Sequence, residues 1–331
     1  MFIHRKNNKL KKKTIIMESF IDVTGLNYCG KEGQEIFSKD IFDLDLRGYG
    51  VTYLDGVKGK QKLYSGEVGE VWQAYTCAFT PEGDVVLSED YIEPVAIKVN
   101  MEECYDKFWS TYLVEQTEIS LHGGVPQTFG EWFFAKLRDE MKKEYQEIFW
   151  KGDTAYTGTV KEYLKVTDGI EKKLEDATGA TKITGSSFTV ANAISQVEGV
   201  ILSGLAKAAD AEVVTDGYKV FMNYADVKLL EIAISQVCCT PINGFGSYGR
   251  NGNGNLVVDG FEVIPTMQTR GTVIFGPAKN LVLGYDTFDS HIEYRFINLR
   301  ETVGDNAFRI IAISNIAVGI VFPELFVYSR P

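Results

Sequence analysis

Residues 128–153, TFGEWFFAKLRDEMKKEYQEIFWKGD, form the strongest local pattern in this chain. Thr128 and Glu131 have the spacing of a capping box, in which each side chain accepts a hydrogen bond from the other residue's amide. Gly152 is a typical helix stop. Apolar residues recur at helical spacing and charged residues fill the opposite face. The pattern predicts one amphipathic helix over 129–150, about 33 Å long and well above the average length of ~11–12 residues. The apolar positions are Phe129, Trp132, Phe133, Leu137, Met141, Tyr145 and Ile148.

The charge balance limits the partners that this chain can bind. The net charge is -11 over 331 residues, although the first sixteen residues carry six basic side chains and no acid. The remainder is therefore strongly acidic, and such a surface repels nucleic acid on average. The composition, 45% hydrophobic and 24% charged, is that of a folded soluble protein. Specific, high-affinity DNA binding is not expected.

Cysteine and histidine usage argues against metal and disulfide chemistry. The five cysteines are an odd number without a CxxC pair, and there are only three histidines. We therefore expect neither a disulfide scaffold nor a metal site, and we expect reduced thiols in a cytosolic setting. No window reaches the ~18 apolar residues of a membrane span. The basic N-terminus is not followed by the apolar segment of a signal peptide.

The N-terminal third is expected to contain extended elements. Residues 1–16 are predicted to be a disordered basic tail, with Met17 as an alternative start and contact with nucleic acid as an alternative role. Residues 17–58 are predicted to be an arm, and residues 59–100 a long β-hairpin. Its strands are placed at 72–79 and 95–99, around the turn chemistry of residues 80–84. Such a hairpin is more stable when it lies on a neighbouring subunit.

The rest of the chain predicts an α+β fold. A polar helical turn at 101–113 precedes the long helix, and residues 101–152 form one unit with it. Residues 153–285 predict a second α+β unit, in which Asn223 is the N-cap of a helix and 244–255 is a flexible loop. Residues 286–331 return to strands. The expected helices are 161–177, 189–209 and 223–236, and the expected strands are 217–222, 256–264, 271–275, 292–301, 308–314 and 318–328, with a hairpin turn at Gly304-Asp305-Asn306 and Pro323 marking an edge or a bulge.

Two glycine patterns invite an enzyme interpretation, and both fail on context. Gly25–Lys31 is close to a phosphate-binding P-loop, but Glu32 stands where a hydroxyl should ligate Mg²⁺. Gly244–Gly249 matches GxGxxG by letter, but no helix is expected to begin at its third glycine. Without a helix N-terminus, no amide cluster is available for a pyrophosphate.

The remaining reactive side chains have no informative partner spacing, so no catalytic, cofactor-binding or metal residue is assigned. His122 and His291 are expected to be ordinary structural or surface histidines. The adjacent Cys238 and Cys239 follow an apolar helix and are expected to pack as small hydrophobic residues. The carboxylates considered were Glu102, Glu103, Asp286 and Asp289, which cannot be paired without a fold.

The order of these elements resembles the major capsid protein of tailed bacteriophages, whose fold is shared with encapsulin shells. The helix ending in Ile148–Asp153 looks like the spine helix of short capsid subunits. Phe261–Pro265, Asn280–Asp286, the 292–314 hairpin and Phe322–Leu325 look like their axial and peripheral strands. The resemblance covers about Met17 to Tyr328.

That resemblance implies a structural protein rather than an enzyme, without cofactors. It implies a homo-oligomer that self-assembles into hexamers and pentamers of an icosahedral shell around double-stranded DNA, which it contacts weakly. Portal and scaffold proteins are implied partners, and the location is the virion, assembled in the host cytoplasm. An encapsulin-type nanocompartment shell is the alternative, and a nucleotide-binding enzyme acting through Gly25–Lys31 is the remote one.

Overall fold

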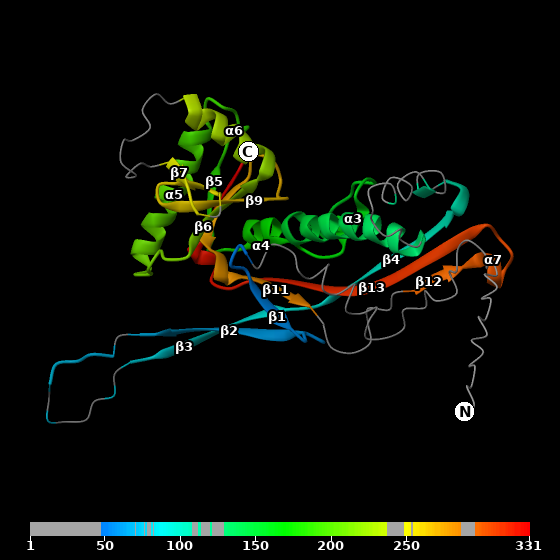
Figure 1. Ribbon diagram of the computed structural model, residues 1–331. Coiled ribbons are helices and arrows are strands. Elements are labelled where there is room, and N and C mark those ends of the chain that lie inside the picture. The colour runs from blue at the N-terminus through cyan, green and yellow to red at the C-terminus, as the bar shows by residue number, and fades with distance from the viewer. Residues whose placement is uncertain are drawn as a thin grey trace, which may run out of the picture.

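The computed structural model divides the chain into two lobes and a projecting hairpin (Figure 1). One lobe combines a five-stranded sheet with the long helix, and the other is built on a seven-stranded sheet. The tail 1–16 and most of the arm 17–58 lie outside the described residues. The structure describes residues 48–69, 71–75, 77, 81, 83–107, 112–113, 120, 129–236, 248–252, 254–285 and 295–331.

The long helix α3 (Phe129–Lys151) confirms the expected helix, and Gly152 follows it directly. The Gly152 amide donates to the carbonyl of Ile148, which closes the last turn at 2.9 Å. A Cβ at Gly152 would lie 2.2 Å from the carbonyl oxygen of Thr167, so only glycine fits there. The apolar face is buried at Phe129, Trp132, Phe133, Tyr145 and Ile148. Thr128 lies outside the described residues.

The five-stranded sheet lies under this helix. Its centre is β13 (Ala307–Ile320), which pairs antiparallel with β4 (Val95–Cys104), β12 (Arg295–Asn298) and β11 (Leu281–Tyr285). Strand β1 (Thr52–Asp55) runs parallel to β11. Alternate residues of β13 face the helix, and the ring of Phe308 lies 5.5 Å from that of Phe129 and 4.9 Å from that of Phe133. Because side chains alternate along a strand, one face of β13 is buried in the core against the helix.

The seven-stranded sheet has two covered faces. Its order is β5-β14-β10-β6-β9-β8-β7. One face contributes Val220 and Phe275 to a core beneath α5 (Ala193–Asp210) and α6 (Tyr224–Gln236). The other face contributes Phe221, whose ring lies 5.4 Å from that of Trp150, so the end of α3 packs against it. The strands are β5 (Thr181–Thr184), β6 (Tyr218–Asn223), β7 (Tyr248–Arg250), β8 (Leu256–Val258), β9 (Phe261–Thr266), β10 (Val273–Pro277) and β14 (Val327–Arg330).

Short helical elements join these parts. Segment η1 (Glu162–Lys165) and α4 (Ile170–Asp176) follow α3, so the single helix expected at 161–177 is wrong. The helix expected at 189–209 begins only at Ala193, because the Asn192 side chain accepts from the amide of Thr189 and closes a turn there. Further short helical elements are η2 (Ala278–Asn280) and α7 (Leu299–Thr302). Asn223 caps α6 as predicted, because its Oδ1 accepts a hydrogen bond from the amide of Ala225 at 2.9 Å.

The expected hairpin exists with different strands. β2 (Gln61–Val68) pairs antiparallel with β3 (Val85–Ile92), whereas residues 72–75 of the predicted strand 72–79 form no regular element. The predicted second strand, 95–99, belongs to β4, which pairs with β13 instead. Residues 101–104, expected to be helical, continue β4. Composition identified extended chain here but not its partners.

Two further strand predictions were wrong for local reasons. Residues 256–264 form two strands, because Asp259 and Gly260 both have positive φ and make a tight hairpin turn. Residues 318–328 contain the end of β13, then η3 (Pro323–Leu325) and the start of β14, since Phe322 adopts left-handed backbone at φ 52°. β14 lies in the seven-stranded sheet and β11 in the five-stranded one, so sheet membership does not follow the expected division at 285/286.

Candidate functional site

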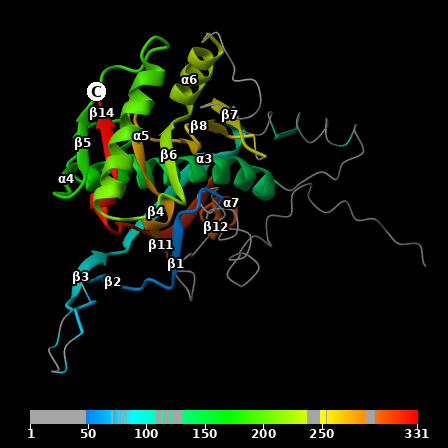
Figure 2. The same ribbon diagram turned by 90° about the vertical axis from the view of Figure 1, so that its left-hand side faces the viewer.

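The hairpin β2–β3 projects from the body, as two views at right angles show (Figures 1 and 2). Its register runs from Gln61↔Ile92 at the base to Val68↔Val85 near the tip. Among the described residues it forms its own two-stranded sheet and pairs with no third strand. An isolated two-stranded ribbon is marginally stable in water. This element therefore requires something outside the ribbon to cover it.

The two faces of the hairpin differ in character. Strand alternation and register place Tyr64, Val85, Leu87 and Tyr91 on one face, and all four side chains are exposed, with Leu87 at 65%. On the opposite face, Leu63 and Ile92 at the base pack with Val57, Val282 and Ala317 of the body. One face anchors the ribbon to its own chain, and the other presents an apolar surface to solvent.

Charged side chains lie beside the apolar residues of this face and contact one another and the Tyr91 ring. Lys62 Nζ lies 2.5 Å from Glu89 Oε2, and both side chains are exposed. Lys60 Nζ lies 4.3 Å from the centre of the Tyr91 ring, and Tyr91 OH donates to Glu89. The hydrogen bond to Glu89 raises the pKa of Tyr91. Exposed pairs of this kind contribute little to stability, so they orient the face rather than stabilise it.

The tip carries the most exposed large side chains of the hairpin. Trp72 is 94% exposed and Tyr75 is 92% exposed. Val71 is also exposed, so residues 71–75 form a short uncharged segment with two aromatic side chains open to solvent. The ladder closes beneath it, where the Gly69 amide donates to the Asp84 carbonyl at 2.7 Å. Contiguous exposed apolar surface of this kind is characteristic of interaction sites.

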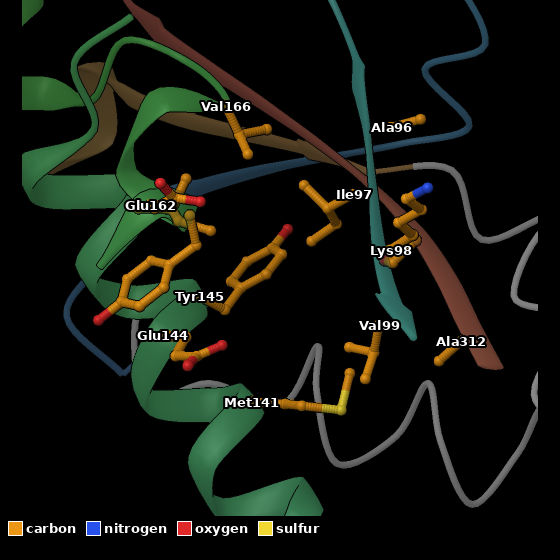
Figure 3. A pocket seen from close by; sticks show the side chains of 13 residues that line it. Ala96, Ile97, Lys98, Val99, Met141, Glu144, Tyr145, Glu162, Val166 and Ala312 are labelled. Carbon is orange, nitrogen blue, oxygen red and sulfur yellow. The ribbon is translucent and has the colours of Figure 1, made fainter. Parts of the chain in front are cut away.

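A second feature is a cavity of about 550 Å³ between α3 and the sheet strands β4 and β13 (Figure 3). Met141 and Tyr145 of α3 face Ile97 and Val99 of β4 across it. The Oγ atom of Ser314 in its wall is buried and has no hydrogen-bond partner within the described chain. The remaining lining residues are Ala96, Lys98, Glu144, Ile148, Glu162, Tyr163, Val166 and Ala312.

A buried carboxylate fixes one wall of this cavity. Glu147 accepts two hydrogen bonds from Lys161 Nζ, at 2.7 and 2.8 Å, and a further one from Tyr163 OH. Burial by itself raises the pKa of Glu147, but the bonds from Lys161 and Tyr163 outweigh it and hold the pKa below its ordinary value. The ionised carboxylate therefore ties η1 to α3.

Two further buried carboxylates hold the loop 267–272 of the other lobe. Glu171 accepts from the amide of Thr269, and Asp226 Oδ2 accepts from the amide of Gly271 at 2.6 Å. Arg270 lies 3.6 Å from Asp226 and is itself exposed. Burial raises the pKa of Glu171, only partly offset by its bond to Thr269. These groups satisfy backbone amides, and their role is structural.

The candidate chemistry considered from sequence forms no site in the part of the chain that the structure describes. Gly25–Lys31, His122, His291 and the Cys238-Cys239 pair lie outside that part, as do Asp286 and Asp289. The third glycine of the GxGxxG pattern, Gly249, lies in strand β7, so no helix begins there, as expected.

The described carboxylates and thiols have simple environments. Glu102 pairs with Arg309 at 2.6 Å, and Glu103 pairs with Lys107 at 2.5 Å. Cys77 and Cys104 are free and exposed. Over the described ranges, no group of three or more potential ligands could hold a metal ion. Within the same ranges, no helix has the length and apolar character to cross a membrane.

The exposed hairpin surface was only partly foreseen. Trp72 and Tyr75 lie in the strand predicted at 72–79, because Trp and Tyr favour strands wherever they are packed. The exposed face follows from the register of β2 and β3, because residues paired across the two strands lie on the same face. This register places Tyr64, Leu87 and Tyr91 together.

Comparison with known proteins places the fold. No family model matches the chain, and no curated protein matches it. The satellite phage P4 procapsid, solved with its size determination (Sid) protein, is similar with a TM-score of 0.58 and 10% identity over 90% of this chain and 90% of that one. Gordonia phage Cozz gives 0.53 and 10% over 87% and 86%. The capsid of an empty GTA particle gives 0.52 and 11% over 86% and 89%.

At these identities the likeness concerns the fold alone. The chain has the mixed α+β fold found in these capsids, across most of its length and with similar coverage of their chains. The fold predicted from the order of elements is therefore confirmed. A fold hosts many functions, and the function has to be argued from the surfaces of this chain.

Proposed function

We propose that this chain is the structural subunit of an icosahedral viral capsid. It self-assembles into hexamers and pentamers that enclose double-stranded DNA, and it is not an enzyme. The observation that carries the proposal is the hairpin face of Tyr64, Val85, Leu87 and Tyr91, which the described residues of its own chain leave exposed. The shared capsid fold supports the same conclusion.

A ring of subunits in a shell requires heterologous contacts, in which each copy binds the next through two different surface patches. The hairpin is anchored on one face by Leu63 and Ile92 and offers the other face at a distance from the body. Such a surface makes a heterologous contact, in which one patch of a copy meets a different patch of the next. Repetition of that contact closes rings when the rotation per copy is a simple fraction of a full turn.

The parts of the subunit take distinct places in this proposal. The arm 17–58 reaches along one neighbour, and the hairpin β2–β3 of the expected loop 59–100 lies over another. Residues 153–285, apart from β11, converge on the axis of a capsomer, with the loop 244–255 near its centre. Residues 101–152, β11 and residues 286–320 form the peripheral part, while β14 belongs to the sheet of the axial part. The basic tail 1–16 faces the enclosed DNA.

The charge of the chain suits a container of DNA. With -11 overall, the wall contacts packaged DNA only weakly and without sequence preference. Tight binding of many phosphates would oppose packing and release. Portal and scaffold proteins complete the proposed set of partners, with assembly in the host cytoplasm.

Microscopy of the purified protein tests the proposal. The full chain is expressed alone and with its neighbouring genes, purified, and imaged by negative stain. Capsomers or closed shells are expected, and nuclease-protected DNA is expected inside particles made in the presence of packaging proteins. A chain that stays monomeric at high concentration and never forms particles would overturn the proposal. Shells holding an enzyme cargo instead of DNA would favour a nanocompartment.

A further inference from the structure

We propose that Trp72 at the hairpin tip of one copy inserts into the cavity between α3 and the β4–β13 sheet of a second copy. This inference rests on the proposed function, because it assigns a specific contact within the assembly. It names one donor side chain and one acceptor cavity, which are different parts of the same chain.

The donor is an aromatic side chain with no cover of its own. Trp72 is 94% exposed, and the neighbouring residues 71–75 carry no charge. Tryptophan is highly buried on average, and it is enriched among the residues that dominate the free energy of binding at interfaces. A fully exposed indole at the end of a projecting element therefore marks a contact with another molecule.

The hairpin cannot deliver this side chain to the cavity of its own chain. Eight paired residues span ~26 Å at about 3.3 Å per residue, and the ribbon runs away from α3 in both views (Figures 1 and 2). Its base is fixed by the buried side chain of Ile92. The indole thus has to meet a cavity on a separate copy.

The acceptor has the size and chemistry that an indole requires. The cavity measures about 550 Å³ and its walls include Ile97, Val99 and Met141. A methionine wall adapts its shape to an aromatic ring and makes favourable sulfur contacts with it. Glu162 lines the same cavity and is exposed, so it offers a partner for the Tyr75 hydroxyl at its mouth (Figure 3).

One donor and one acceptor per chain define the contact as heterologous. An uncharged aromatic segment meets a cavity whose walls are mostly apolar. A small molecule would explain the cavity but not the exposed Trp72. A second copy explains both features with one contact.

Cross-linking between two variants tests the contact. Both are made in the full chain with all five cysteines replaced by serine. One carries Trp72→Cys as the donor, and the other carries Val166→Cys, a conservative change in the cavity wall. The two are mixed under assembly conditions and oxidised. A covalent dimer is expected from the mixture and from neither variant alone. Val303→Cys, an exposed position on the connection between α7 and β13, replaces Val166→Cys as the control and is expected to give no dimer.

The outcomes separate this inference from the proposed function. Particles that form without the mixed cross-link overturn the inference and leave the capsid proposal standing. A Trp72→Cys dimer in the donor alone also overturns it, because the tips would then pair with each other. Failure to form any particle with the unmodified chain overturns both.

A second pair of variants guards against loss of folding. Trp72→Ala removes the donor at an exposed site, and Val166→Trp fills the cavity from its rim. Each is expected to raise the concentration needed for assembly about tenfold or more, as loss of an interface hot spot does. The double variant is expected to be no worse than either single one. Additive effects would contradict a shared contact, provided that the melting temperature of each variant matches the parent.

Discussion

Gly204 of α5 lies directly against the ring of Phe275 in β10. A Cβ at position 204 would be 2.2 Å from Cδ1 and 2.5 Å from Cε1 of that ring, and Phe275 is fully buried. The absence of a side chain brings the helix against the seven-stranded sheet at this point. A glycine that lowers helix propensity is therefore explained by packing.

Gly204→Ala is expected to destabilise the subunit by ~1–3 kcal/mol, because the ring or the helix must shift to admit the methyl group. Gly199→Ala, in the same helix, is the matched control. Apart from the neighbouring backbone of the helix itself, nothing lies within 4 Å of a Cβ there, so that change is expected to stabilise by about 0.5–1 kcal/mol through helix propensity. Denaturant unfolding of the two variants measures both effects. Equal effects of the same sign would contradict the packing.

Glu147→Gln is expected to destabilise by about 1–3 kcal/mol at neutral pH, since it weakens the charge-assisted bonds from Lys161 and Tyr163. The pKa of Glu147 is lowered in the folded state, so its stabilising contribution is present above its ordinary value of 4.5 and disappears as the pH falls through the lowered value. The difference between parent and variant should shrink over that acidic range in thermal melts.

Glu140→Gln serves as the control on the same helix. Glu140 pairs with Lys143 at 2.8 Å, and both side chains are about half exposed. Its substitution is expected to change stability by no more than ~0.5 kcal/mol, with no added acid sensitivity. A loss as large as that of Glu147→Gln would mean that burial of Glu147 is not what matters.

Glu171→Gln is expected to show the opposite dependence on pH. Burial raises the pKa of Glu171 in the folded state, so its contribution to stability is present below its ordinary value of 4.5 and is lost as the pH rises through the raised value. The variant removes a buried charge while its amide oxygen still accepts from Thr269. It should gain stability relative to the parent on going from pH 4 to pH 7, measured in the same melts. A relative loss over that range would contradict the assignment.

Leu87→Lys is expected to prevent assembly while the subunit stays folded. Leu87 is 65% exposed and central to the apolar hairpin face, so the charge costs nothing in the free subunit but has to be desolvated in a contact. We expect at least a tenfold increase in the concentration required for assembly, as for loss of a hot spot, measured by light scattering. Gln61→Lys, on the opposite face, is the control and should assemble normally. Normal assembly of Leu87→Lys would exclude this face as a contact.

The long helix was predictable because its information is local. Residues 129–151 have apolar positions at helical spacing and Gly152 at the end, and the structure has the helix within one residue of the prediction. The same holds for Asn223 as the cap of α6. Hydrogen bonds in a helix join residues four apart, so the sequence carries both partners of each bond.

The strand partners were not predictable in this way. β4 and β13 pair over about 200 positions of sequence separation, as at Glu102↔Arg309. A single run near residue 322 divides between two sheets because Phe322 takes left-handed backbone. Strand composition describes a residue's tendency to be extended and half-buried, and it does not identify the strand beside it.

By itself, the sequence determined the α3 rod, its stop at Gly152, the cap of α6, the acidic charge and the existence of a projecting hairpin. Only the tertiary structure decided which face of that hairpin is anchored, and that Trp150 is buried while Trp72 is open to solvent. The two tryptophans have the same affinity for an apolar environment. What differs is whether their own chain supplies it, and that depends on contacts between residues far apart in sequence.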